Sequence, residues 1–209
     1  MNKKLLNYQK LHTFASPKKK TKLTRSISNI ATIKSGVYAK TATEGDCLYL
    51  QGKDFSESGE LDTSLAPSVR VADANPKHFL NHNDILLLAR GDNNAAFLFT
   101  NTEYPALASP TFLVLTVNEF DIQPEFLLWY LNSYLGQKRL KRESKGSSIQ
   151  SITIKTLANI EIDIPPMNIQ DQIVAIANLS TRRTKLSTEL NHLKRKEVEL
   201  LLFETAKKQ

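Results

Sequence analysis

The chain has 209 residues, 41% of them hydrophobic, and a formal net charge of +7. This length allows one domain with an appendage, or at most two small domains. A single cysteine, Cys47, excludes an internal disulfide and a zinc site built from several cysteines, and no apolar run approaches the length of a membrane helix. We therefore expect a cytosolic protein.

The positive charge lies mainly in the first 25 residues. That segment holds eight lysine and arginine side chains and no acid, which leaves 20 basic against 21 acidic side chains in the other 184 residues. The rest of the chain is therefore not globally basic, and any binding of a polyanion must come from this segment or from local patches. Residues 1–25 are predicted to be weakly ordered, and a leader that only aids solubility is the alternative to a binding role.

Residues 27–117 are predicted to form mostly strands, in a domain that begins near Leu23. Short apolar runs alternate with turns rich in Gly, Asn and Asp, and the continuously apolar runs are typical of buried strands. The expected strands are residues 30–33, 48–50, 69–71, 85–88, 96–99 and 112–117.

A helix is predicted from Phe126 to about Arg142. Pro124 suits its first turn, and its apolar side chains, which include Trp129, Tyr134 and Leu135, indicate a broad buried face. The end of this helix is basic. A second β region at residues 152–154 and 158–164 is expected to follow, and Pro165-Pro166 ends it.

The last helix is predicted to run for about forty residues from Asn168, a plausible N-cap. Its apolar residues follow a heptad with leucine at every d position and charge at several a positions, which indicates a coiled-coil seam. Such a helix is about 55–60 Å long and marginal alone in water, so it needs a partner along this stripe. The a positions are Ile176, Arg183, Leu190, Glu197 and Glu204, and the d positions are Leu179, Leu186, Leu193 and Leu200.

The charged a positions favour an antiparallel partner. A parallel homodimer would place Arg183 against Arg183 and Glu197 against Glu197, which crowds like charges at two layers. An antiparallel pair centred near Leu190 brings Arg183 of one chain towards Glu197 of the other.

The sequence holds no convincing catalytic constellation. The four histidines are scattered, and His78 and His82 flank asparagines typical of a turn, so a metal pair there is the weaker interpretation. No phosphate-binding or dinucleotide-binding glycine motif and no nucleophile elbow is present. We expect no catalytic residue, no metal and no cofactor.

Signals for binding to nucleic acid are clearer. The basic helix end leads into a Gly-Ser-Ser loop, which supplies cations and then hydroxyl and amide groups suited to phosphates and base edges. The alternative is an ordinary solvated helix end, where cations also favour the helix dipole. A polar segment at residues 90–94 is a second candidate, although Asn-Asn is common in plain turns. The candidate DNA-binding residues are Lys34, Arg70, Arg90, Asn93, Asn94, Lys138, Lys141, Arg142, Lys145, Ser147, Ser148 and Gln150.

Several short motifs, taken in order, resemble half of a type I restriction-modification specificity (S) subunit. Two departures are Ile164, where leucine is usual, and Asp171-Gln172, where Glu-Gln is typical. The matching segments are Ile-Lys-Ser-Gly at 33–36, Asn-Asp-Ile-Leu-Leu at 83–87, Pro-Glu-Phe-Leu at 124–127, Gly-Ser-Ser-Ile-Gln at 146–150, the strand at 157–164, and Pro165-Pro166 with Gln-Asp-Gln-Ile-Val at 170–174.

The resemblance implies an α+β fold: a β-rich globular target-recognition domain with short helices at residues 26–164, then one long C-terminal coiled-coil helix at 165–209. It implies a non-catalytic subunit that reads one half of a bipartite site in double-stranded DNA. The implied partners are methyltransferase (modification) subunits, which methylate adenine, and a restriction subunit that joins that core.

A full specificity subunit has two recognition domains and two long helices, whereas this chain has one of each. The half-length chain is therefore expected to form an antiparallel homodimer through its last helix and to read a palindromic split site, with no role for a membrane. The alternative is a protein-interaction module with a β-rich domain on a dimerising helix and no DNA role, which the near-neutral charge beyond residue 25 supports. A divergent nuclease or methyltransferase is the weakest reading, because no site supports it.

Overall fold

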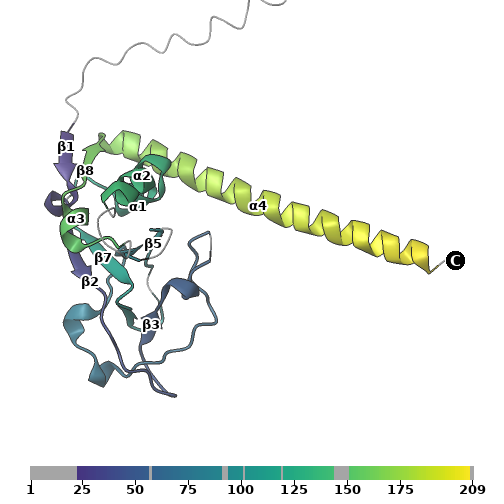
Figure 1. Ribbon diagram of the computed structural model, residues 1–209, viewed down its shortest axis with the longest axis horizontal. Helices are drawn as coiled ribbons and strands as arrows, with labels where there is room; N and C mark the ends of the chain where they lie inside the picture. The colour runs from purple at the N-terminus through teal and green to yellow at the C-terminus, as the bar shows by residue number, and fades with distance from the viewer. Residues whose placement is uncertain are drawn as a thin grey trace, which may run out of the picture.

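The computed structural model describes residues 23–56, 58–90, 94–100, 102–118, 120–143 and 151–207. Residues 23–164 form a β-rich domain with short helices, which we call the head. One long helix, the stalk, leaves the head and projects far beyond it (Figure 1). This arrangement confirms the α+β fold expected from the sequence.

The centre of the head is a four-stranded antiparallel sheet. Its strands run in the order β2 (Ala31–Ser35), β7 (Phe112–Val117), β4 (Ile85–Leu88) and β5 (Ala96–Leu98). Alternate residues of β4 and β7 point to opposite faces, and a separate hydrophobic cluster covers each face. Both strands therefore read as continuous apolar runs, as predicted.

Two smaller sheets complete the head. Strand β3 (Leu48–Leu50) pairs parallel with β6 (Ala106–Ala108), and β1 (Leu23–Ser26) pairs antiparallel with β8 (Glu161–Ile164). The sequence did not predict β1 or β6. Strand β1 fixes the beginning of the head next to its end, and its first residue is Leu23, near which the domain was expected to begin.

The run at residues 69–71, expected to be a strand, forms none. Val69 makes a single bridge to Cys47, and Val71–Asp73 is the 3-10 helix η3. Three further 3-10 helices are η1 (Ile27–Asn29), η2 (Gly52–Asp54) and η4 (Pro76–His78).

The prediction of a second β region at residues 152–154 and 158–164 is also only partly correct. Residues Ile154–Ala158 form the helix α3, because the side chains and backbones of Thr153 and Thr156 cap its first turn reciprocally. Strand β8 therefore begins only at Glu161.

The helix expected to be continuous from Phe126 is two helices, α1 (Pro124–Asn132) and α2 (Tyr134–Glu143). Ser133 between them is extended, and its hydroxyl donates to the backbone oxygen of Tyr130 and accepts from the amide of Gly136. A Cβ at Gly136 would lie 2.0 Å from that same Tyr130 oxygen, so only glycine lets α2 pass so close.

The break also changes which side chains are buried. Phe126, Leu127 and Leu131 enter the core as expected. Trp129, Tyr134 and Leu135 were expected on the same buried face, but they are 37%, 78% and 65% exposed. The break at Ser133 separates Trp129 on α1 from Tyr134 and Leu135 on α2, and all three side chains lie at the surface.

The stalk is α4 (Met167–Ala206), a helix of 40 residues and about 60 Å. Pro166 occupies the N-cap position, so Asn168 lies in the first turn and is not the cap that the sequence suggested. Within the described part of the chain, none of the helices combines the length and the hydropathy needed to cross a membrane.

A buried glutamine joins the stalk to the head. The side-chain oxygen of Gln170 accepts from the amide of Gln123 at 2.9 Å, and its Nε2 donates to the backbone oxygens of Asp121 at 2.7 Å and Pro165 at 2.9 Å. Gln123 Nε2 in turn donates to Asp171 at 2.5 Å. Gln170 is fully buried, so these bonds fix the first turn of the stalk to the start of α1.

Replacing Gln170 with alanine should lower the free energy of unfolding by about 2–4 kcal/mol, because it leaves one donor and two acceptors without partners inside the protein. Urea denaturation measures this change. The matched control is Gln172→Ala, two residues along the same helix at an exposed position, which should leave the stability nearly unchanged. Equal effects of the two substitutions would contradict a structural role for the buried amide.

Candidate nucleic-acid interface

Two polar segments were singled out in the sequence, residues 90–94 and the Gly-Ser-Ser loop. The first begins at the same place on the head where the second ends. Arg90 forms an isolated antiparallel bridge with Ser151, and the amide of Ile152 donates to the backbone oxygen of Ala89 at 2.8 Å. The first segment follows Arg90 and the second precedes Ser151. The residue at the start of the predicted polar turn and the residue just after the predicted Gly-Ser-Ser loop therefore lie side by side. Asn93, Lys145, Ser147, Ser148 and Gln150 lie outside the described residues.

Asn94 is buried beneath this bridge. Its side-chain amide donates to the backbone oxygen of Leu88 at 2.9 Å, and its own backbone oxygen accepts from Gln137 of α2 at 2.8 Å. These bonds hold Asn94 itself against α2. Arg90, in contrast, is exposed and its guanidinium can reach outward.

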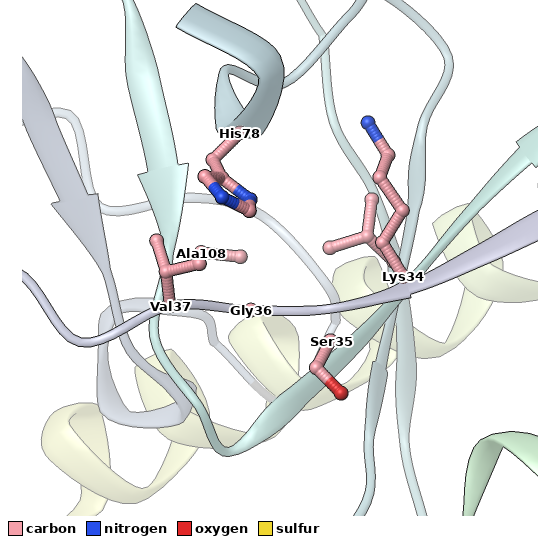
Figure 2. Close-up of a pocket in the computed structure, with 7 residues that line it drawn as sticks. Lys34, Ser35, Gly36, Val37, His78 and Ala108 are labelled. Atoms are coloured by element: carbon pink, nitrogen blue, oxygen red, sulfur yellow. The ribbon is translucent and has the colours of Figure 1, made fainter. Parts of the chain in front are cut away.

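Lys34 lies on β2 beside a small cavity. Its amine donates to the backbone oxygen of Lys77 at 3.5 Å, and Figure 2 shows Lys34 and His78 on either side of the cavity. The cavity holds about 10 Å³, roughly the space of one water molecule. His78 Nδ1 is buried without a hydrogen-bond partner among the described residues, which makes a water here the simplest way to satisfy it.

Gly36, two residues after Lys34, must be glycine because its backbone passes very close to the backbone of Ser109. A Cβ at Gly36 would lie 2.0 Å from the backbone oxygen of Ser109. The Ile-Lys-Ser-Gly motif therefore ends where the chain after β2 passes against the chain after β6. The glycine permits this contact, which helps to fix the position of Lys34 on β2.

Arg70 has a carboxylate partner on the head itself. Its guanidinium lies 2.9 Å from the carboxylate of Asp73 on η3, and both side chains are exposed. A phosphate would therefore have to compete with this carboxylate. In the described part of the chain, no three His, Cys, Asp or Glu side chains gather as a metal site.

The cations of α2 lie beside a groove. Lys138, Lys141 and Arg142 are exposed, and Arg142 lies 3.3 Å from Glu143. Arg139 donates to the Tyr130 hydroxyl at 3.0 Å and to the backbone oxygen of Glu161. Burial raises the pKa of the Tyr130 hydroxyl, against the opposing effect of Arg139, so this phenol stays neutral and accepts the bond.

Sequence reasoning missed this groove. It has a volume of about 1050 Å³ and lies between α1, α2 and the first turns of α4. Helical periodicity placed Trp129, Tyr134 and Leu135 on a buried face, but all three line the groove, and the break at Ser133 lies between Trp129 and the other two. No residue pattern marks that break except the Ser133–Gly136 spacing.

The heptad side chains of the stalk are uncovered along its length. The two charged a positions, Arg183 and Glu197, lie on the same exposed stripe. The apolar members are half to two-thirds exposed: Ile176 68%, Leu179 67%, Leu186 55%, Leu190 52%, Leu193 55% and Leu200 56%.

The head contacts the middle of the stalk from another side. Lys185 Nζ lies 2.8 Å from Glu60 of the head, and this cation lowers the pKa of the Glu60 carboxyl. Lys185 occupies a c position of the heptad, well away from the a and d stripe. The apolar stripe borders this contact at Leu186, which lines the same hollow as Glu60, and its exposed leucines are open to a second helix.

Comparison with known proteins identifies the family. Residues 17–199 match the model of the type I restriction modification DNA specificity domain. No curated protein matches the chain. A chain from a structure of the type I R-M system shares the fold with a TM-score of 0.66 at 22% identity, over 91% of this chain and 45% of that one.

Two further structures agree. The HsdS subunit from Thermoanaerobacter tengcongensis gives a TM-score of 0.63 at 18% identity, over 86% of this chain and 46% of that one. The S subunit of the type I restriction-modification system from M. genitalium gives 0.54 at 19%, over 83% and 42%. The chain thus spans less than half the length of each. Since the family model covers most of its residues, the chain belongs to the type I restriction-modification DNA specificity family, whose subunits are non-catalytic.

Proposed function

We propose that this chain is a half-length DNA-recognition subunit that rebuilds a complete specificity subunit as an antiparallel homodimer. The observation that carries the proposal is the uncovered leucine stripe of the stalk, in a chain that spans less than half the length of the S subunits it resembles. A helix of this length needs a partner. A second copy supplies one with a matching stripe and a second head.

In this dimer each head reads one half of a bipartite site in double-stranded DNA. The bases are contacted from the edge where Arg90 and Ser151 meet, by Arg90, Asn93, Ser147, Ser148 and Gln150, while Asn94 is held against α2. Phosphates are bound by Lys138, Lys141, Arg142 and Lys145, with Lys34 and Arg70 as further contacts. Two identical heads related by a two-fold axis read a palindromic split site.

The spacing of the two heads supplies affinity. A single head with a few groove contacts binds weakly, because it buries little surface and neutralises few phosphates. Two heads held at a fixed separation act at a high effective concentration on the second half-site. The paired stalks also bind the methyltransferase subunits, to which a restriction subunit is added, and the complex acts on DNA in the cytoplasm.

Charge reversal of Lys141 and Lys145 to glutamate should weaken DNA binding by the complex assembled with methyltransferase subunits. The slope of log K against log salt should fall by about 2, because each lysine releases about one counterion from a phosphate. Filter binding or fluorescence anisotropy over a salt series measures both the affinity and the slope.

The matched control for this test is Lys40→Glu with Lys53→Glu, which changes the net charge equally at two exposed head positions outside the candidate set. The control should shift affinity only slightly. An unchanged slope in the Lys141 and Lys145 variant would remove these residues from the interface.

The solution mass tests the dimer. Light scattering should give twice the chain mass of 23.5 kDa. In an antiparallel dimer, Arg183→Glu places an acid within one turn of Glu197 of the other copy at two symmetric places, so the dimer dissociation constant should rise about five- to tenfold.

The double variant Arg183→Glu with Glu197→Arg should restore the wild-type dissociation constant, because it exchanges the two charges across the seam. A parallel dimer predicts a different outcome. There, Arg183→Glu replaces one like-charge pair with another, and neither the single nor the double variant changes the affinity much.

A further inference from the structure

The groove beside α2 is an unfilled apolar surface with a basic rim. The rings of Phe126 and Trp129 lie 5.6 Å apart in its wall, and Tyr134 and Leu135 are largely exposed there. Ile173, in the second turn of the stalk, lines its other side. Since α1 and α2 lie beside the beginning of α4 (Figure 1), the groove sits at the base of the stalk.

The far end of the stalk carries more apolar surface than a two-helix seam can cover. Leu200 is the d position, yet Leu201, Leu202 and Phe203 follow it directly and are 56%, 67% and 60% exposed. Successive residues of a helix are turned by about 100°, so these four side chains surround most of the helix. The side chains outside the seam need a second surface.

The heptad fixes where that end lies in an antiparallel dimer. In such a pair an a position of one helix faces a d position of the other. The register that pairs all four d leucines with a positions of the second copy places Ile176 against Leu200 and Leu190 against Leu186. This register keeps Arg183 within one turn of Glu197 of the second copy. It places Phe203 of that copy opposite Ile173, at the side of the groove.

We propose that the C-terminal end of the second copy's stalk, residues 200–204, fills this groove. The inference rests on the proposed homodimer and adds a contact between each head and the opposite stalk. Its apolar part packs Leu202 and Phe203 against Trp129 and Leu135. Its charged part brings Glu204 to the basic rim.

Charge favours the second copy's stalk end over residues 1–22 of the same chain as the occupant of the groove. The rim cations, Lys138 and Arg139, would repel residues 1–22, which contain seven lysines and no acid. The last ten residues of the stalk, 197–206, hold Glu197, Glu199 and Glu204 and no base, between the bases at 194–196 and Lys207. The basic rim and acidic helix end are complementary, and they meet in the same register that pairs the apolar layers.

Site-directed crosslinking between two differently tagged copies tests the contact. One copy carries Leu135→Cys and the other Phe203→Cys, and the mixed protein is treated with a short bismaleimide. The native Cys47 is buried and its pKa is raised to about 11, chiefly by burial, so it carries almost no thiolate and stays unreactive. The linked heterodimer is expected with this pair.

The matched control combines Leu135→Cys with Leu179→Cys, an equally exposed leucine near the beginning of the stalk. In the antiparallel register this second cysteine lies about 40 Å from the groove of the other copy, so the linked product should be lost. Product with Leu179→Cys and none with Phe203→Cys would overturn the inference and the antiparallel arrangement together.

The solution mass and Trp129 separate the two proposals. Trp129 is the only tryptophan, so its quenching by acrylamide reports the groove, whereas light scattering reports the dimer. At a concentration where both proteins are dimers, acrylamide should quench Trp129 more strongly in the Leu202→Asp, Phe203→Asp variant than in the wild type. A dimer with unchanged quenching and no crosslink refutes the groove contact alone, whereas a monomer at every concentration refutes both proposals.

Discussion

The buried amide of Gln170 determines how the rest of the molecule is used. It satisfies a donor before α1 and two acceptors, one before α1 and one before α4, from within the core. An amide is suited to this place because it donates and accepts at once, and its burial makes each lost bond costly. The direction of the stalk is thereby tied to the core of the head. A spacer sets the distance between two binding sites only if its ends are fixed in this way.

The charge distribution agrees with DNA recognition through a few correctly placed contacts, without a general positive charge. Beyond residue 25 the chain carries nearly equal numbers of acids and bases, so it lacks the broad positive field of a nonspecific DNA-binding protein. The candidate contacts are local, at the edge where Arg90 meets Ser151 and at the end of α2. Specific binding in the proposed dimer then depends on placing two such edges at once. The stalk, with its exposed leucines and its contact between Lys185 and Glu60, supplies that placement.

The parts of the fold that were predictable have a strong period. Strands β4 and β7 are buried on both faces and therefore continuously apolar, and the stalk repeats leucine every seven residues. Strand β6 has three residues, Ala-Leu-Ala, too few to show a period, and its partner β3 is distant in sequence. The break at Ser133 depends on one hydroxyl and one missing Cβ, so a helical pattern runs through it unnoticed. The joint at Gln170 was hidden for a related reason, since a glutamine near a helix start is ordinarily exposed.

A half-length subunit uses each of its surfaces twice. In the proposed homodimer the two-fold axis crosses the middle of the paired stalks, so a charge pair at Arg183 and Glu197 occurs once on each side of it. The same symmetry brings each stalk end to the opposite head. Each head would then be held both by its own Gln170 and by the helix of the other copy. A change in the register of the seam would shift both heads together and alter the spacing between half-sites, without touching any residue that contacts DNA.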